Sequence, residues 1–187
     1  MGRLLAVVAL FVPLATSGVA CRVVPDQRVT GSDGSVTRGS TAREDEIAAD
    51  LLARANAERG ARGLEALVWD PKLATRAFGW SETMAGTGLR HSDLHPLLAR
   101  FVGVAENIGT GAPSTTAGAM HLAWMHSDSH RHDLLAPHLD RVGIGVVCGA
   151  DGTMWATQQF GSTGSGEFGA VPPSNPIARP DPGSLTC

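Results

Sequence analysis

The strongest constraint on the fold is a pair of apolar runs near the end of the chain. Residues 142–147 (Val-Gly-Ile-Gly-Val-Val) and 154–160 (Met-Trp-Ala-Thr-Gln-Gln-Phe) have the length and composition of β-strands. The sequence Gly-Ala-Asp-Gly at 149–152 separates them and is typical of a tight turn. The two runs are therefore predicted to pair as an antiparallel hairpin. Helical patterns come earlier and do not alternate with strands, so the predicted class is α+β.

Upstream of the hairpin, the sequence predicts helices and one further extended segment. A first helix is expected over 41–60, because Thr41 and Glu44 have the spacing of a capping box. A second is expected over 70–86, because Asp70 is followed by proline, a favourable pair at a helix start. The remaining expected elements are an extended segment over 101–108, a helix capped by residues 114–116, and a helical turn or two over 127–135.

The first 20 residues are interpreted as a secretory signal peptide. Arg3 supplies a positive charge, residues 4–15 are almost wholly apolar, and small residues lead up to Cys21. The run Ser-Gly-Val-Ala-Cys resembles a bacterial lipobox, in which Cys21 would be lipidated, although Gly18 stands where leucine is usual. An ordinary signal peptidase would cut at the same bond and leave Cys21 unmodified, so both outcomes stay open. We expect an exported protein, extracellular or in the cell envelope, with no membrane contact except through a lipid on Cys21.

Composition divides the rest of the chain and excludes several classes. Residues 21–40 and 162–187 are rich in Gly, Ser, Thr and Pro, which predicts a flexible tether and an extended tail around a folded domain at 41–161. The formal net charge of −3, without a basic block, argues against nucleic acid as a partner. No second long apolar run exists, which excludes a polytopic membrane protein. We expect a monomer.

Three cysteines leave one without a partner. If Cys21 carries lipid, Cys148 and Cys187 remain as a pair in an oxidising compartment, and a disulfide between them would tie the carboxyl terminus to the domain. The alternative is a buried free thiol at Cys148 and a loose end at Cys187.

A series of short motifs resembles the CAP superfamily (cysteine-rich secretory proteins, antigen 5, pathogenesis-related class 1) in its bacterial branch. The resemblance implies a three-layer α-β-α sandwich with a central antiparallel sheet and a cleft lined by histidine and acidic side chains. The motifs are Asn56-Ala-Glu-Arg59, Leu67-Val-Trp69-Asp70, His91-Ser92, Glu106-Asn107-Ile108, Trp124 to Arg131, Val142 to Val146, and Trp155 to Gly161.

Carried over by position, the cleft residues are His91, Glu106, Ser127 and His130. Many eukaryotic members have a second glutamate near the position of Ser127 and a second histidine before the final strand, where this chain has Met154. This departure weakens any activity inferred from eukaryotic relatives.

The cleft residues allow two kinds of chemistry. His91 and His130 are the metal ligands we expect, with water and Glu106 completing an open site for zinc or another divalent transition metal. The alternative is a hydrogen-bonded network of the same residues without metal. For catalysis, Glu106, His130 and Ser127 are the residues considered: Ser127 and His130 are three apart on an expected helix and would face one space. No nucleophile elbow accompanies them.

Residues outside the cleft are interpreted structurally. Asn56 and Arg59 are expected to lock the first helix to neighbouring backbone, as the resemblance implies. The four tryptophans are expected to anchor the core. All seven histidines lie between positions 91 and 138, and those without a counterpart in the family are expected at the surface or at helix ends: His95, His121, His132 and His138.

Three functions are compatible with these residues. The first is a binding module whose cleft holds a metal ion, a lipid or another small ligand. The second is a peptidase-like hydrolase in which Glu106 works with a histidine- or metal-activated water. The third is a surface interaction protein with a vestigial cleft. The incomplete cleft set favours the first.

Overall fold

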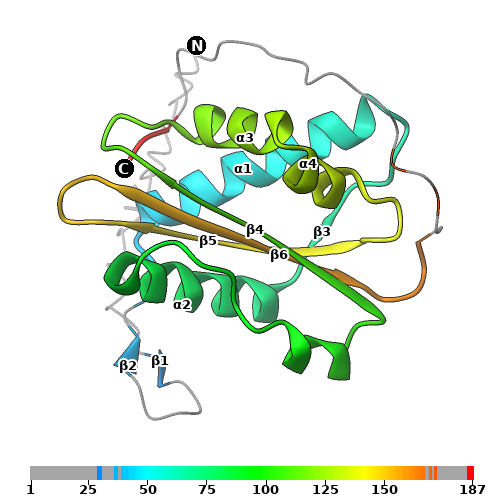
Figure 1. Ribbon diagram of the computed structural model, residues 1–187, viewed down its shortest axis with the longest axis horizontal. Coiled ribbons are helices and arrows are strands. Elements are labelled where there is room, and N and C mark those ends of the chain that lie inside the picture. The colour runs from blue at the N-terminus through cyan, green and yellow to red at the C-terminus, as the bar shows by residue number, and fades with distance from the viewer. Residues whose placement is uncertain (1–28, 31–35, 38, 167–168, 170, 172–184) are drawn as a thin grey trace, which may run out of the picture.

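The computed structural model describes residues 29–30, 36–37, 39–166, 169, 171 and 185–187. It confirms the α+β class and the three-layer sandwich: one helix covers one face of a sheet, and three helices cover the other (Figure 1). The elements are β1 (Val29–Thr30), β2 (Val36–Thr37), α1 (Ala42–Gly60), β3 (Val68–Trp69), α2 (Pro71–Thr87), the 3-10 helix η1 (His95–Ala99), β4 (Gly103–Gly111), α3 (Ala117–His126), α4 (Asp128–Leu135), β5 (Arg141–Cys148) and β6 (Met154–Ser162).

The main sheet has the strand order β3-β5-β6-β4. Strands β5 and β6 form the predicted antiparallel hairpin, and β4 pairs antiparallel with β6 along its whole length. The short strand β3 differs from the expected antiparallel arrangement, because it pairs parallel with β5. Its chain enters from α1 and continues into α2, and the amide of Asp70 donates to the carbonyl of Val142 at 2.8 Å. Strand β4, the last in the strand order, forms the edge of the sheet opposite β3.

The two faces of β5 carry different side chains. Val142, Ile144 and Val146 are buried in the core formed with α1, α3 and α4. Gly143 and Gly145 lie on the opposite face, under α2, which packs directly on the backbone. A Cβ atom added at Gly145 would lie 2.0 Å from the backbone nitrogen of Phe78. Glycine at these positions is therefore what allows α2 to lie flat on the sheet.

Helix α1 is fixed at both ends as the sequence predicts. The capping box is present: Thr41 and Glu44 each accept from the other's backbone amide. At the other end, the buried Arg59 donates to four backbone carbonyls, at distances from 2.7 to 3.0 Å. Burial lowers the pKa of Arg59 to about 10, and the charge of Asp140 opposes that shift. Asn56 exchanges two hydrogen bonds with the backbone of Leu67.

The tryptophans do not all anchor the core. Trp124 is buried, and its Nε1 donates to the carbonyl of Ile108 at 3.0 Å. Trp80 and Trp155 are half-buried. For Trp69 the expectation was wrong, since 40% of it is exposed. It lies in a two-residue strand at a sheet edge, where neither layer of helices covers it.

The carboxyl terminus returns to the domain. Cys187 forms a disulfide with Cys148, with 5.3 Å between their Cα atoms, as expected for a pair in this arrangement. The amide of Ala117, at the start of α3, donates to the carbonyl of Leu185 at 2.8 Å, and Arg43 donates to the carbonyl of Thr186 at 2.8 Å. The last three residues thus join β5, α1 and α3.

The predicted signal peptide, Cys21, most of the tether and most of the tail lie outside the described residues. Within the described part of the chain, no helix is both long enough and apolar enough to cross a bilayer.

We predict that Gly145→Ala lowers the free energy of unfolding by about 3 kcal/mol, because its methyl group would overlap the backbone of α2. Urea denaturation measures the effect. Gly79→Ala, in α2 itself, is the matched control. A Cβ at Gly79 meets nothing within 4 Å, so this change should raise stability by about 0.5–1 kcal/mol. Equal effects of the two substitutions would contradict the packing argument.

Candidate functional site

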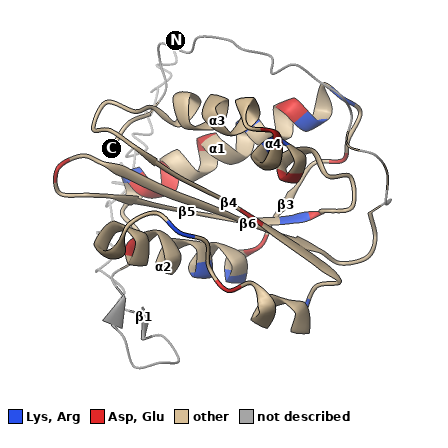
Figure 2. Cartoon of the chain, in the orientation of Figure 1, with Lys and Arg blue, Asp and Glu red and all other residues tan. Residues whose placement is uncertain are grey.

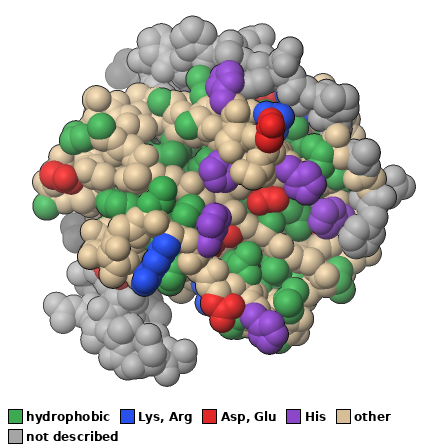
Figure 3. All heavy atoms as spheres, in the orientation of Figure 1, with side chains coloured by type: hydrophobic (Ala, Val, Ile, Leu, Met, Phe, Trp, Pro, Cys, Tyr) green, Lys and Arg blue, Asp and Glu red, His purple; other side chains and the backbone are tan. Residues whose placement is uncertain are grey.

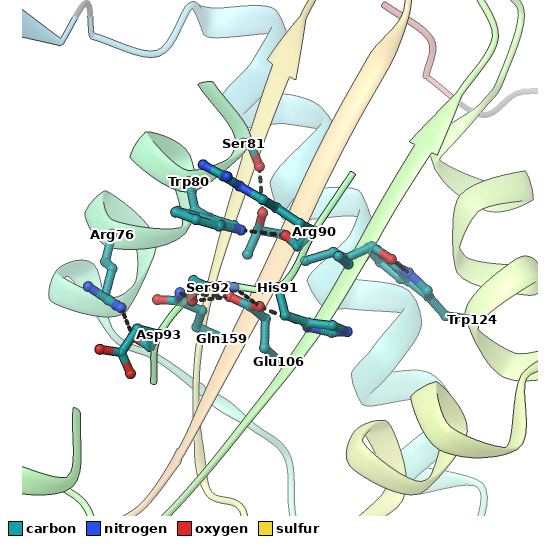
Figure 4. A network of polar contacts seen from close by, with 12 residues as sticks. Arg76, Trp80, Ser81, Arg90, His91, Ser92, Asp93, Glu106, Trp124 and Gln159 are labelled. Carbon is teal, nitrogen blue, oxygen red and sulfur yellow. Dashed lines mark hydrogen bonds and ion pairs between the residues drawn. The ribbon is translucent and has the colours of Figure 1, made fainter. Parts of the chain in front are cut away.

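Glu106 is the centre of the site. It lies on β4, its side chain is only 1% exposed, and it points toward the α2 layer. Its Oε1 accepts from the backbone amide of Ser92 at 2.8 Å and contacts His91 Nδ1 at 2.9 Å. Its Oε2 accepts from the Ser92 hydroxyl at 2.5 Å and from Gln159 Nε2 at 3.0 Å (Figure 4). The carboxylate is thus held by four contacts.

This arrangement sets the orientation of His91. The ring is exposed, at 61% of its side chain, and its Nδ1 faces the carboxylate. A carboxylate only accepts hydrogen bonds, so Nδ1 carries the proton and donates. The lone pair of the neutral ring is then on Nε2, which points away from Glu106 (Figure 4). His91 can therefore offer Nε2 to a metal ion or to a ligand proton.

The loop that carries His91 is anchored on α2. Trp80 Nε1 donates to the carbonyl of Arg90 at 2.9 Å, and the guanidinium of Arg90 lies 5.4 Å from the centroid of the Trp80 ring. Arg76 donates to the carbonyl of Asp93. The loop starts at Gly88, whose φ of 90° favours glycine. These contacts fix the backbone before and after His91.

His130 approaches the site from the other layer. It lies on α4, and its backbone carbonyl accepts from Asn107 Nδ2 on β4 at 3.1 Å. Its Nδ1 is buried and has no hydrogen-bond partner among the described residues. Burial lowers the pKa of His130, the charge of His91 lowers it further, and the charge of Asp133 opposes the shift. His91 contacts Glu106 and His130 contacts Asn107, so the two histidines lie on opposite sides of edge strand β4.

Ser127 does not share a helix with His130. Its backbone is extended (ψ 125°), so α3 ends and α4 begins at this residue. The two separate helical elements expected here are both present, and the second begins one residue later than expected, with Ser127 as its N-terminal cap, a position that serine favours over the helix interior. The Ser127 hydroxyl lies 3.2 Å from that of Ser129, and no hydrogen bond joins Ser127 to His130 in the described structure.

Three site residues were not singled out from the sequence. Ser92 and Gln159 contact Glu106, and the charges of both cleft histidines act on Asp133, which lies on α4, by lowering its pKa. Burial raises the pKa of Asp133, while hydrogen bonding to His132 opposes the shift. Gln159 carries a detectable signal, since a long polar residue within an apolar strand needs a buried partner.

No group of three or more histidine, cysteine or acidic side chains within the described ranges is arranged to hold a metal ion. Any metal bound by His91 and His130 would complete its coordination with water. Figure 2 shows acidic and basic residues interspersed over the described parts of the chain.

The remaining histidines divide between surface and core. Histidine side chains gather on the face drawn in Figure 3, and His95, His126 and His132 are exposed. The surface expectation was wrong for His121, which is buried on α3 with no hydrogen-bond partner for either ring nitrogen in the described structure. Burial lowers the pKa of His121 to about 4. The charges of Arg54 and Arg62 lower it further, and Asp50 opposes them.

We predict that His121 makes the protein acid-labile. The unfolded chain protonates this histidine near its ordinary pKa of 6.5 and the folded protein near 4. The folded state therefore loses stability as the pH falls from about 6.5 to about 4, by about 3 kcal/mol. His121→Leu should remove this part of the pH dependence in urea denaturation followed from pH 7 to pH 4. His126→Leu, an exposed position on the same helix, should retain it; an unchanged slope in His121→Leu would contradict the prediction.

Most of the folded part of the chain matches a known family. The sequence model described as "CAP: Cysteine-rich secretory protein family" matches residues 52–160. The uncharacterized protein YkwD of Bacillus subtilis (strain 168) is 30% identical over 115 residues, which are 56% of this chain and 43% of that protein. The chain therefore spans less than half the length of this relative.

Two solved structures share the fold. One is an outer surface protein from Borrelia burgdorferi, with a TM-score of 0.57 and 19% identity over 63% of this chain and 92% of that one. The other is an extracellular protein containing an SCP domain from Bacillus anthracis str. Ames, with a TM-score of 0.56 and 22% identity over 69% of this chain and 47% of that one. At these identities the likeness concerns the fold alone.

Proposed function

The chain belongs to the cysteine-rich secretory protein (CAP) family, and on that premise we propose that it is an exported binding module. Its cleft binds a divalent transition metal ion, zinc being the first to test, through His91 and His130. Glu106 orients His91 and does not itself take part in chemistry.

One observation carries this proposal: the carboxylate of Glu106 already has four contacts, two on each oxygen. A carboxylate held in this way fixes the tautomer and direction of a histidine, as carboxylates do behind metal-ligating histidines. A general base would instead need an oxygen free to take a proton from water. The contacts therefore favour binding over a peptidase-like reaction.

The two imidazoles suit a transition metal of modest affinity. His91 directs Nε2 away from Glu106, and burial keeps His130 neutral to lower pH than an ordinary histidine. Imidazole nitrogens are good ligands for zinc and copper, and two of them leave open positions for water. A bound divalent metal would act as a Lewis acid toward a ligand in those positions.

Export is supported by the sequence of residues 1–20 and by the two structural neighbours, one an outer surface protein and the other an extracellular protein. Lipidation of Cys21 belongs to the same proposal. It would hold the domain at a membrane through the chain before Thr41.

The test is zinc titration by calorimetry with residues 22–187, prepared without a histidine tag. We predict that His91→Ala/His130→Ala weakens binding at least tenfold, about 1.4 kcal/mol, because each substitution removes a nitrogen ligand. The matched control is His126→Ala/His132→Ala, which removes two exposed histidines from α3 and α4 and should bind as the parent does.

Equal loss in both double variants would show that zinc binds surface histidines and not the cleft. A parent protein that binds no zinc would overturn the metal proposal. Titration with fatty-acid vesicles would then test the lipid alternative. If the His91 and His130 variants bind the vesicles as the parent does, the cleft residues are not used for binding, and the interpretation as a surface protein with a vestigial cleft remains.

A further inference from the structure

Two pairs of polar side chains face each other across β4 and β6. Glu106 lies opposite Gln159, and Asn107 lies opposite Gln158. Neighbouring residues on a strand point to opposite faces, so the two pairs serve different layers. The first contacts His91 and Ser92 on the α2 side, and the second reaches the backbone of His130 on the α4 side. Each cleft histidine is thus attached to one cross-strand pair.

Gln159 is fully buried between strands that leave it little freedom. Its Nε2 donates to Glu106 Oε2 at 3.0 Å and to the hydroxyl of Ser92 at 3.1 Å. On its other side lies Gly143, over which α2 packs. The amide orientation is set by the carboxylate, because the reverse orientation would bring the Gln159 oxygen against a second acceptor.

One atom of the Gln159 side chain is unfavourable for the stability of the fold. Its Oε1 is buried and has no hydrogen-bond partner within the described structure, and an unpaired buried acceptor costs free energy. An apolar residue of similar shape would avoid that cost. It would also take one donor from the buried carboxylate of Glu106, so the polar amide at this position is explained by what Nε2 does to Glu106.

We propose that Gln159 is a positioning residue for the cleft: with Ser92 it holds the Glu106 carboxylate in the one orientation that keeps the proton of His91 on Nδ1 and leaves Nε2 available. The zinc part of the test rests on the proposed function, whereas the orientation of His91 does not. Without the amide, Oε2 keeps only the Ser92 hydroxyl, and the carboxylate can rotate away from His91.

The test compares Gln159→Met, which keeps length and shape but removes the amide, with Thr157→Val. Thr157 is the matched control because it lies two residues earlier on β6, is fully buried on the same face, and bonds to Ser81 at 2.8 Å instead of to Glu106. Nitrogen NMR of the metal-free protein at pH 8 reports which ring nitrogen of His91 carries the proton. Zinc titration and urea denaturation complete the set.

The parent and Thr157→Val should show the Nδ1 proton on His91, and Gln159→Met should lose it in part or whole. Zinc affinity of Gln159→Met should fall roughly tenfold to a hundredfold, as for partners of metal ligands elsewhere, and its urea midpoint should fall as well, because the buried Glu106 carboxylate loses one donor. An unchanged His91 tautomer in Gln159→Met would overturn the proposal, and so would the same change in Thr157→Val. If the parent binds no zinc, the proposed function fails, and the tautomer measurement still decides the role of Gln159.

Discussion

The contact of α2 with bare backbone at Gly143 and Gly145 is the constraint on which the site depends. Because no side chain separates the helix from β5, α2 lies close enough for Ser81 to bond both the carbonyl of Gly145 and the hydroxyl of Thr157. The loop that leaves α2 therefore runs close to the sheet. Ser92 can reach Glu106 with both its amide and its hydroxyl, and the position of His91 follows.

The two cleft histidines are consequently unequal. His91 is exposed and backed by a carboxylate, whereas His130 is partly buried and its Nδ1 has no partner in the described structure. A proton or a cation approaching the pair meets an oriented, electrostatically supported imidazole on one side. On the other side it meets an imidazole that burial disfavours charging. The two rings therefore differ both in exposure and in electrostatic surroundings.

Local signals explain why much of the fold could be predicted from the sequence. The capping box at Thr41, the aspartate-proline start at Asp70 and the turn before Met154 each act within a few residues, and all three elements are present. The parallel pairing of β3 could not be predicted, because two residues carry no alternation. The burial of His121 was missed because α3 is apolar on most sides, so its sequence does not show which face is inward.

The same distinction between local signals and three-dimensional arrangement applies to the site. His91, Glu106 and His130 could be identified through a family resemblance, but their roles could not. The role of Gln159 depends on its register with Glu106, 53 residues away in the sequence. The place of Ser127 at the cap of α4, outside the helix, is likewise a matter of backbone geometry. Spacing alone would place both Ser127 and His130 on one helix face.

The bond between Cys148 and Cys187 also changes the topology of the polypeptide. It closes a covalent ring that contains the whole of β6 and the chain from there to Cys187. A single protease cut within this ring leaves both new ends attached to the same molecule. The strand that carries Gln159 therefore cannot be released from β5 by one cleavage in the tail.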